Sequence, residues 1–419
     1  MDYFEIYGGY SLSGEISVYA AKNAVLPMMA SAILSENGTT VLRNIPDIAD
    51  VRTMADVLRK LGADVDFDKE KHIISINAEN NRNFEAPYEL VSKMRASFLV
   101  MGSLLAKFGM ARVSQPGGCA IGARPIDQHI KGFLQLGAKI EEEHGYTVAR
   151  AKKLCGNIIY FDRPTHTGTE NIMMSAVLAE GTTRIINAAQ DPEISDLAEM
   201  LNRMGAKISG AGTSTITIEG VNSLSSVDYT PIGDRLEAST YLFAAISAGG
   251  EIIVRNVSPK HLEFVLSKMS DMGAKIEMGK NWVKASISER PKPVDIITDP
   301  YPGFPTDLQP IIMAVLCKAD GTSVVWERIF ENRFIHIMEL RRLGANITIS
   351  GDKATIVGVK NLEGAEIMAS DIRAGAGLTI AALGARGKSL VQRIYHIDRG
   401  YQKLEERLSS LGARISRKY

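Results

Sequence analysis

Leu61-Gly62-Ala63-Asp64-Val65 is the first copy of a short motif that decides the fold of this 419-residue chain: a hydrophobic residue followed by Gly-Ala-x-Val/Ile. The motif occurs six times, at a spacing of about 70 residues, and such self-similarity is the signature of a fold built from repeated units. The glycines of the six copies are Gly62, Gly137, Gly205, Gly273, Gly344 and Gly412.

A second mark recurs in step with the first. A glycine that opens a short β-rich run precedes each copy of the motif, as in Gly38-Thr39-Thr40-Val41-Leu42. Two marks that recur together in this way predict six equivalent units. The opening glycines are Gly38, Gly109, Gly181, Gly250, Gly321 and Gly387.

Each unit is predicted to combine helices with strands. The stretch before the opening glycine is apolar and rich in Ala, Met and Leu, which predicts a nearly buried helix that ends in a glycine cap. After the β-rich run, Val51, Met54, Leu58 and Leu61 fall at helical spacing, so an amphipathic helix is expected there. The Gly-Ala-x-Val/Ile run and residues 72–76 then predict two strands.

The sixth unit is incomplete, because the chain ends at Tyr419, soon after its last motif. The missing part has a counterpart at the other end of the chain. Residues 4–12 resemble residues 354–362 and residues 215–224, which are the equivalent parts of other units. We therefore expect residues 1–21 to complete the last unit.

This completion sets the expected domain organisation. With three units in each domain, one domain covers residues 22–232, and the other combines residues 1–21 with residues 233–419. The predicted fold class is α/β, with two domains and three repeats around a pseudo-three-fold axis in each. The chain would cross between the domains near Lys22 and near Gly233.

Composition excludes several classes of protein. Lys+Arg and Asp+Glu both total 48, so the basic excess typical of nucleic-acid-binding proteins is missing. The longest apolar runs, such as residues 24–34, are shorter than the roughly 20 residues that a membrane span needs. The acidic opening, residues 1–5, does not resemble a signal peptide. Three cysteines make no disulfide framework, so a cytoplasmic location is expected.

No metal and no cofactor are expected. No pair of Cys or His residues has metal-ligand spacing, and Cys317 ends an apolar stretch as a core residue would. The glycine-rich segment near residue 118 lacks both the Gly-Lys-Ser/Thr of a P-loop and the GxGxxG of a dinucleotide site. Among the seven histidines, only His129 is a candidate functional group by its position, one helical turn after Asp127.

The first helix of every unit is predicted to begin with polar or charged residues. Helix N-termini present free N–H groups and a positive dipole end, which favours anions. Basic residues are unfavourable there on the same grounds, so an anionic ligand would explain them; the alternative is that they are solvated caps. The starts are Lys22-Asn23, Arg95, Thr167-Gly168-Thr169, Asp234-Arg235, Thr306-Asp307 and Arg373.

Residues 114–125 form an exceptional segment, with three glycines within six residues. Such a run favours a flexible, exposed loop. Cys119 within it would be accessible, and Arg124 would favour its thiolate form. The alternative is an incidental surface cysteine. Pro125 suits the first position of the following helix, which places Asp127 in its first turn.

At this point the chain resembles the UDP-N-acetylglucosamine 1-carboxyvinyltransferases, a branch of the enolpyruvyl transferases. The resemblance covers the chain from end to end. It implies a two-domain inside-out α/β barrel and transfer of the enolpyruvyl group of phosphoenolpyruvate to the sugar 3-hydroxyl, with release of phosphate and no cofactor. The motifs that carry it are Lys22-Asn23, Pro116-Gly117-Gly118-Cys119, Gly122-Ala123-Arg124-Pro125, Phe304-Pro305-Thr306-Asp307, Glu331-Asn332-Arg333-Phe334 and residues 393–401.

The resemblance also implies roles for individual residues. Lys22, Arg124 and Arg399 match the clamp on phosphoenolpyruvate, with Asn23 as a further contact, and arginine forks suit phosphate and carboxylate. Cys119 matches the general acid that protonates the methylene carbon, a thiol that is also trapped as a covalent adduct.

Asp307 matches the carboxylate that holds the sugar 3-hydroxyl and accepts its proton. The remaining positions implied for the UDP-sugar are Asn23, Arg95, Arg124, Pro125, Ile126, Asp127, Gln128, Pro164, Thr165, His166, Thr167 and Ile329. Secondary positions near the site are Glu193, Asp234, Arg333, Asp371 and Arg373.

Two alternatives remain open at this stage. The sister enzyme that acts on shikimate-3-phosphate shares the fold and phosphoenolpyruvate, but it lacks the cysteine loop. A catalytically silent paralogue would have lost Lys22, Asp307 or Arg399, and all three are present. The expected partners are the two small-molecule substrates, without nucleic acid or membrane insertion, and the chain is expected to be a monomer or a weak oligomer.

Overall fold

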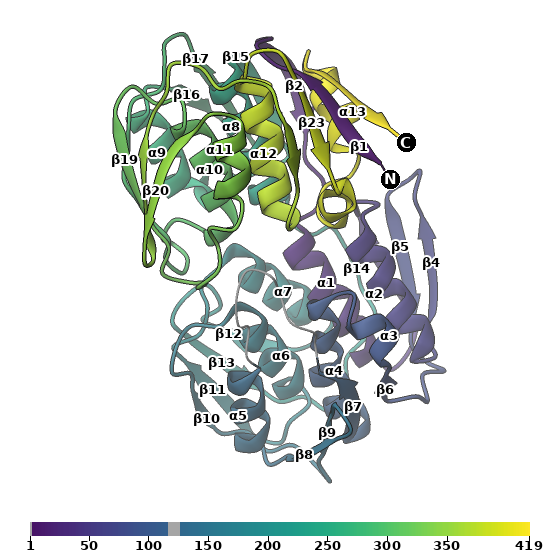
Figure 1. Cartoon of the computed structure of the whole chain (residues 1–419). Helices are drawn as coiled ribbons and strands as arrows, with labels where there is room; N and C mark the ends of the chain where they lie inside the picture. Colours follow the sequence, from purple (N-terminus) through teal and green to yellow (C-terminus); the bar gives the residue numbers. More distant parts are fainter. Residues whose placement is uncertain (1, 116–125) are drawn as a thin grey trace. The chain divides into compact units, whose positions relative to one another are not determined.

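The computed structural model describes residues 2–115 and 126–419 (Figure 1). These residues form two compact units. We call residues 20–115 with 126–232 the N-terminal unit, and residues 2–19 with 233–419 the C-terminal unit. None of the helices in the described ranges combines the length and apolar character that crossing a membrane requires.

The described strands form six sheets of four strands, and all six sheets share one topology. An edge strand runs parallel to its neighbour, and the other two pairings are antiparallel, as in the sheet β14-β3-β5-β4. In the N-terminal unit the sheets are β14 (Asp228–Tyr229), β3 (Thr39–Arg43), β5 (Ile73–Asn77), β4 (Asp64–Asp68); β6 (Glu85–Ala86), β7 (Met110–Ser114), β9 (Tyr146–Arg150), β8 (Lys139–Glu143); and β10 (Ile158–Tyr160), β11 (Thr182–Ile186), β13 (Thr215–Glu219), β12 (Lys207–Ser209). The α/β fold class with six repeated units is thus confirmed.

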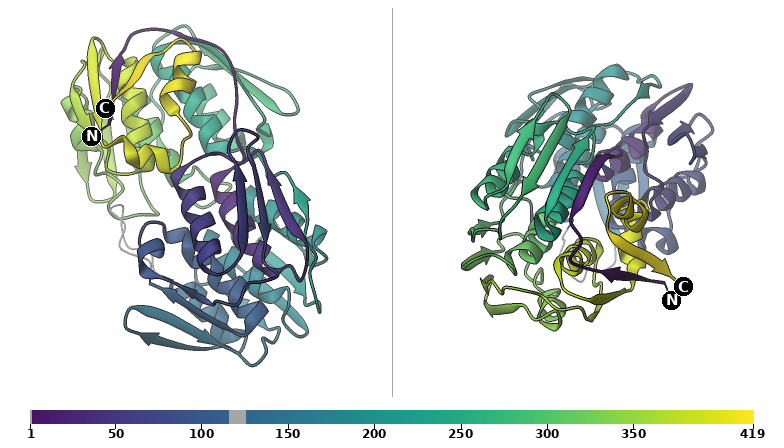
Figure 2. Two further views of the ribbon diagram at one scale, coloured as in Figure 1. Left: turned by 90° about the vertical axis from the view of Figure 1, so that its right-hand side faces the viewer. Right: turned by 90° about the horizontal axis from the view of Figure 1, so that it is seen from above.

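The C-terminal unit repeats this arrangement. Its sheets are β2 (Leu12–Ser17), β15 (Gly250–Arg255), β17 (Trp282–Ile287), β16 (Lys275–Met278); β18 (Ile296–Ile297), β19 (Thr322–Trp326), β21 (Lys353–Val357), β20 (Asn346–Ser350); and β22 (Glu366–Met368), β23 (Lys388–Gln392), β1 (Tyr3–Tyr7), β24 (Arg414–Lys418). β1 occupies the place that β21 holds in its own sheet, which is the correspondence that the sequence predicted. The two chain ends therefore lie side by side, with Tyr3 opposite Lys418 (Figure 2).

Three apolar helices form the centre of each unit. In the N-terminal unit these are α1 (Lys22–Ser31, followed by the 3-10 turn η1, Ala32–Leu34), α4 (Val100–Phe108) and α6 (His166–Ala176). A Cβ on Gly102 of α4 would lie 2.3 Å from the Asn171 carbonyl oxygen, so only glycine lets α4 and α6 pack this closely. The amphipathic helices α2 (Ala49–Lys60), α5 (Asp127–Gln135) and α7 (Pro192–Arg203) each bury one face, and α3 (Tyr88–Val91) is short.

The C-terminal unit has the same inner trio. Its members are α8 (Arg235–Ala248), α10 (Gln309–Leu316) and α12 (Ile372–Gly384). Strands such as β16, β17, β19 and β20 lie outside them (Figure 1). Because hydrophobic helices occupy the centre and sheets cover them, the barrel is inside out. The other helices are α9 (Glu263–Asp271), α11 (Ile337–Arg342) and α13 (Leu404–Ser410), with the 3-10 turns η3 (Pro259–His261) and η5 (Ile394–Arg399).

The glycines that marked the repeat owe their recurrence to backbone conformation. All twelve of them have positive φ, for example +100° at Gly62, +90° at Gly344 and +83° at Gly181. L-residues with a Cβ avoid this region. At Gly181 and Gly344 an added Cβ would meet nothing within 4 Å, so φ alone, and not lack of space, selects glycine there.

Two of the predicted helix starts differ from the structure. Arg95 begins a 3-10 turn, η2 (Arg95–Leu99), and Thr306 begins another, η4 (Thr306–Leu308), before the α-helices α4 and α10 start. For η4 the reason is Pro310, which lies in the first turn of α10 and has no N–H to bond the Thr306 carbonyl. The sequence around Arg95 holds no comparable signal.

Candidate functional site

Lys22 begins α1, and its Nζ lies 2.9 Å from Oδ2 of Asp50 on α2. Both side chains are largely buried, at 13% and 5% exposure. The sequence analysis offered an anionic ligand as the explanation for basic residues at these helix starts. In the structure Lys22 and Arg373 each also have a carboxylate partner within their own unit, which is an explanation that the sequence analysis did not consider. Asn23, the next residue of α1, is half-buried.

The two segments implied for the UDP-sugar in the N-terminal unit lie together. Gln128, near the start of α5, donates from Nε2 to the Asp162 carboxylate at 3.0 Å, and its Oε1 accepts from the Asp162 N–H at 2.9 Å. The same amide donates to Asp127 Oδ2 at 2.9 Å. Gln128 therefore fixes the segment that leads into α6 against the start of α5, which brings residues 126–128 close to residues 164–167.

His129 makes the second connection between these segments. The ring is 2% exposed and lies edge-on to Phe98, with ring centroids 5.4 Å apart. Burial lowers the pKa of His129 to about 3, and the nearby charge of Arg95 adds to the effect. The imidazole is therefore neutral, and only one of its nitrogens carries a proton.

The position of that proton follows from Asn171 on α6. Asn171 Oδ1 accepts from the Gly102 N–H at 2.8 Å, so its Nδ2 is the donor to the Phe98 carbonyl and to His129 Nδ1, both at 3.1 Å. Nδ1 is thus an acceptor, and His129 Nε2–H donates to Thr167 Oγ1 at 3.2 Å. The Thr167 hydroxyl, on the first turn of α6, keeps its own proton for donation.

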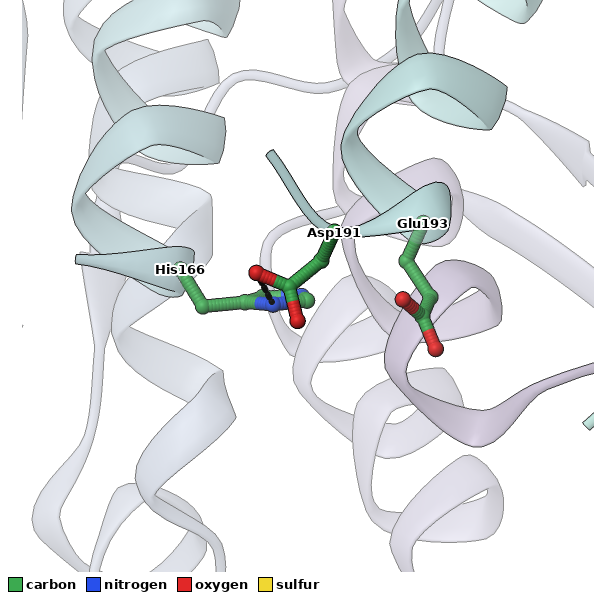
Figure 3. Close-up of side chains that lie close together, drawn as sticks. All are labelled: His166, Asp191 and Glu193. Atoms are coloured by element: carbon green, nitrogen blue, oxygen red, sulfur yellow. Dashed lines mark ion pairs between the residues drawn. The ribbon is translucent and has the colours of Figure 1, made fainter. Parts of the chain in front are cut away.

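His166 is the first residue of α6 and lies beside Asp191 and Glu193, at the start of α7 (Figure 3). Glu170, one turn later on α6, is a third acidic neighbour. His166 Nε2 is 3.1 Å from Glu170 Oε1 and His166 Nδ1 is 3.6 Å from Asp191 Oδ2. Glu193, on the first turn of α7, is fully buried, and its carboxylate lies within 4.8 Å of the ligand atoms of His166 and Asp191. The sequence analysis named His166 and Glu193 but did not foresee this cluster, because their contact depends on how α6 and α7 pack.

A cluster of this composition could in principle hold a metal ion, but its electrostatics favour a proton. Burial lowers the pKa of His166, yet the charges of Glu170 and Asp191 outweigh burial and hold it well above its ordinary value. The ring is therefore protonated at neutral pH. In this state both ring nitrogens carry protons, and the charge of the imidazolium compensates the nearby carboxylates.

In the C-terminal unit, two buried arginines hold Asp307. Arg333 Nη2 donates to Asp307 Oδ1 at 3.1 Å, and Arg373 Nε donates to Asp307 Oδ2 at 3.2 Å. Arg333 also donates to the Thr306 carbonyl through Nε and Nη2, at 3.3 and 3.2 Å. Pro310 has no N–H to bond this carbonyl, which accepts instead from the Gln309 N–H of the 3-10 turn. The Thr306 carbonyl is thus shared between the turn and Arg333.

Glu327 ties this turn to the Ile329 segment, and the sequence analysis missed it. The Thr306 hydroxyl donates to the Glu327 carboxylate at 3.1 Å, and the N–H groups of Ile329 and Phe330 donate to its Oε1 at 2.9 and 3.1 Å. Glu327 is 4% exposed, and burial raises its pKa. The signal available in the sequence was that Glu327 is a charged residue shortly before the Glu331-Asn332-Arg333 motif.

The remaining predicted residues fall at helix ends. Asp234 and Asp371 are the N-caps of α8 and α12, and each accepts from two N–H groups of the first turn. Arg333 Nη1 lies 3.9 Å from Asp371 Oδ1, and Arg399 is the half-buried last residue of η5. Cys119, Arg124 and Pro125 lie outside the described residues.

Comparison with known proteins gives a direct result. The chain is 50% identical over 418 residues to a UDP-N-acetylglucosamine 1-carboxyvinyltransferase of Myxococcus xanthus, covering 100% of this chain and 99% of that protein. It is 52% identical over 407 residues to UDP-N-acetylglucosamine 1-carboxyvinyltransferase 1 of Caldanaerobacter subterraneus, covering 97% of each. The chain belongs to the UDP-N-acetylglucosamine 1-carboxyvinyltransferase family. Residues 6–408 also match the family described as EPSP synthase (3-phosphoshikimate 1-carboxyvinyltransferase).

Solved structures extend this family relationship to the fold. The enolpyruvyl transferase NikO of Streptomyces tendae superposes with a TM-score of 0.89 at 24% identity, covering 100% of this chain and 99% of that one. EPSP synthase of Acinetobacter baumannii superposes with a TM-score of 0.76 at 17% identity, with 100% of both chains covered. These likenesses establish the inside-out α/β fold that the family resemblance implied.

Proposed function

We propose that this chain transfers the enolpyruvyl group of phosphoenolpyruvate to the 3-hydroxyl of UDP-N-acetylglucosamine. The sugar oxygen bonds to the central carbon of phosphoenolpyruvate while the methylene carbon gains a proton, which gives a tetrahedral intermediate. Loss of a proton from the former methylene carbon and of phosphate then restores the double bond. This reaction opens the synthesis of peptidoglycan precursors.

One observation carries the proposal: the full-length identity of about half to relatives of that name, over a chain in which Lys22, Cys119, Arg124, Asp307 and Arg399 are all present. We assign Asp307 as the acceptor of the hydroxyl proton and Cys119 as the donor to the methylene carbon. Lys22, Arg124 and Arg399 are assigned to the phosphate and carboxylate of phosphoenolpyruvate.

The geometry around Asp307 supports its role. A general base must present a carboxylate with a fixed orientation. Arg333 and Arg373, which are 3% and 4% exposed, occupy one side of each Asp307 oxygen with charge-assisted hydrogen bonds. A carboxylate oxygen can accept more than one hydrogen bond, so these arginine contacts are compatible with a substrate hydroxyl at the same carboxylate. In the N-terminal unit, the Thr167 hydroxyl is available as a hydrogen-bond donor. Because the UDP-sugar is rich in oxygen atoms that accept hydrogen bonds, this supports the assignment of residues 164–167 to the UDP-sugar.

A phosphate-release assay tests the proposal. With phosphoenolpyruvate present, UDP-N-acetylglucosamine should support release, and shikimate-3-phosphate, the acceptor named by the matched EPSP synthase family, should not. Asp307→Asn and Cys119→Ala should each lower kcat by roughly 10²–10⁴. The matched control is Asp320→Asn, since the Asp320 side chain is 75% exposed, and it should keep wild-type kcat. Phosphate release with shikimate-3-phosphate but not with UDP-N-acetylglucosamine would refute the assignment.

A further inference from the structure

Arg373, which holds Asp307, is also hydrogen-bonded to a row of buried polar groups in the C-terminal unit, and the proposed chemistry assigns no role to these groups. Arg373 Nη1 donates to the Tyr401 hydroxyl at 3.0 Å, and this hydroxyl lies 2.8 Å from Thr240 Oγ1 on α8. Tyr401 and Thr240 are each 1% exposed, and Arg373 is 4% exposed. The row therefore runs from the inner helix α8 through Tyr401 to the guanidinium that holds Asp307.

The direction of every hydrogen bond in this row is fixed. Thr240 donates its proton to the Leu236 carbonyl at 2.7 Å, so its oxygen accepts from Tyr401. The Tyr401 hydroxyl therefore donates its proton to Thr240. Its oxygen accepts from Arg373, because a guanidinium can only donate. Burial raises the pKa of Tyr401, so the phenol stays protonated. The result is one ordered sequence of donors, Arg373 to Tyr401 to Thr240 to Leu236.

This order restrains the orientation of Arg373. The guanidinium is planar, so a bond that fixes Nη1 restricts the direction of Nε as well. Nε is the atom that donates to Asp307 Oδ2 at 3.2 Å, and the guanidinium also lies 5.3 Å from the centre of the Tyr401 ring. Without the phenol oxygen, Nη1 would lose its acceptor in a buried setting, and a rotation that recovers one would move Nε.

We infer that Tyr401 is a positioning residue for the reaction: through Arg373 it sets the orientation of the Asp307 carboxylate. The inference rests on the proposed function, in which Asp307 accepts the hydroxyl proton. Tyr401 touches no reacting atom in this scheme, so its removal should act on turnover more than on substrate binding. A base displaced by a fraction of an ångström costs rate without loss of affinity.

The same unit contains a matched control. Tyr241 is fully buried, accepts from Arg407 Nε at 2.7 Å and donates to Glu237 Oε1 at 3.0 Å. It is thus a second buried phenol between an arginine and an acceptor, and among the described residues its partners, Arg407 and Glu237, are not the ones that hold Asp307. Tyr241→Phe reproduces the loss of a buried hydroxyl without touching the row behind Asp307.

The test compares Tyr401→Phe, Thr240→Val and Tyr241→Phe in the full chain, with phosphoenolpyruvate and UDP-N-acetylglucosamine. Tyr401→Phe should lower kcat on the order of 10- to 100-fold, with each KM within about threefold of wild type. The acid limb of its kcat–pH profile should move to higher pH, because a carboxylate that loses an arginine contact binds its proton more tightly. Thr240→Val should also lower kcat and move the acid limb of the kcat–pH profile to higher pH, but by less, since Tyr401 keeps its hydroxyl.

Tyr241→Phe should match Tyr401→Phe in lost melting temperature while keeping the wild-type pH profile. If Tyr401→Phe and Thr240→Val both retain wild-type kcat and pH profile, the positioning role is refuted. If Tyr401→Phe fails to fold, Thr240→Val decides by the same two readouts. Wild-type protein that releases no phosphate with UDP-N-acetylglucosamine would instead overturn the proposed function, so the two failures are distinguishable.

Discussion

At the scale of single residues, His129 and His166 show how surroundings set charge. They lie on neighbouring helices of the N-terminal unit, α5 and α6. Among the described residues, the hydrogen-bond partners of His129 are Thr167 and Asn171, which are both neutral, so burial dominates and the pKa of His129 falls to about 3. His166 faces Glu170 and Asp191, and their charges hold its pKa well above the ordinary value despite burial. One ring is thus a fixed donor and the other a fixed cation.

The neutral state of His129 predicts how stability depends on pH. Between about pH 6.5 and pH 3, the unfolded chain binds a proton that folded His129 cannot, so folding stability falls as pH decreases through this window. His129→Gln, whose amide can mimic both hydrogen bonds, should remove up to about 1.4 kcal/mol per pH unit from this slope. The measurement is the free energy of urea unfolding at several pH values from 4.5 to 7.

The exposed His144, in the turn between β8 and β9, provides the control. His144→Gln should leave the slope as it is in wild type. Other groups, such as Asp196 with its pKa raised to about 6 by burial, contribute equally to both proteins and cancel in the comparison. A His129→Gln slope equal to wild type would mean that the folded His129 binds its proton normally.

At the scale of elements, each of the six repeats depends on its two left-handed glycines, one before a β-strand and one after an amphipathic helix. Gly181 precedes β11 with φ +83°, and its missing Cβ would face open space. Any loss of stability on substitution there must therefore come from backbone conformation and not from collision. This makes Gly181 a clean place to measure what the repeat motif contributes.

Gly181→Ala should destabilise the protein by about 1–2 kcal/mol, the usual cost of placing an L-residue in the left-handed region. Gly181→Asn adds a larger side chain into the same open space, but asparagine tolerates this conformation better, so it should cost less than alanine. Urea unfolding of both variants measures the difference. An asparagine variant less stable than the alanine variant would show that space, and not φ, selects glycine.

Elements with a local signal were predictable from the sequence. The amphipathic helix expected to end before Gly62 is α2, and the strands expected near residues 64 and 73 are β4 and β5. Pro310, although visible in the sequence, also forces the 3-10 turn at Thr306, and the prediction overlooked it. The physical reason is that the spacing of apolar residues, from which the helix was predicted, carries no information about a missing backbone N–H.

The candidate site was predictable only as a set of residues, through family resemblance. Which of them touch depends on packing between elements far apart in sequence. Gln128 meets Asp162 because α5 packs against α6, and Tyr401 reaches Arg373 from the segment after η5. Neither contact has a periodicity or spacing that a single sequence could reveal.

At the scale of the molecule, the N-terminal residues are structural parts of the C-terminal unit. β1 lies in the interior of its sheet, paired to β23 on one side and to β24 on the other. β2 forms the edge of another sheet beside β15. Phe4, Ile6 and Leu12 are fully buried in the core of this unit. Without β1 the strands β23 and β24 would lose their common partner, and that core would be open to water.

The N-terminal unit differs, because residues 20–232 supply all of its strands from one continuous stretch. Its closing strand is β14, which returns to pair in parallel with β3, Asp228 opposite Val41 and Tyr229 opposite Leu42. Tyr229 donates to Asp196 Oδ1 at 2.6 Å, which anchors the end of the unit to α7. Both units therefore need a distant segment to close their first sheet, but only the C-terminal unit draws it from the other end of the chain.

This difference predicts how fragments of the chain behave. Residues 233–419 alone should fail to fold cooperatively, since they lack β1 and β2. A circular permutant in which residues 233–419 are followed by a short Gly/Ser linker and residues 1–19 should fold, because β1 pairs with β24 and places Tyr3 opposite Lys418 (Figure 2). Thermal melts followed by circular dichroism distinguish the two: a sigmoidal transition is expected only for the permutant.

The same permutant with Phe4→Asp and Ile6→Asp is the control and should lose that transition, because two charges would enter the core at positions of 0% exposure. A cooperative melt of residues 233–419 alone would show that β1 and β2 are dispensable and would contradict the dependence argued here.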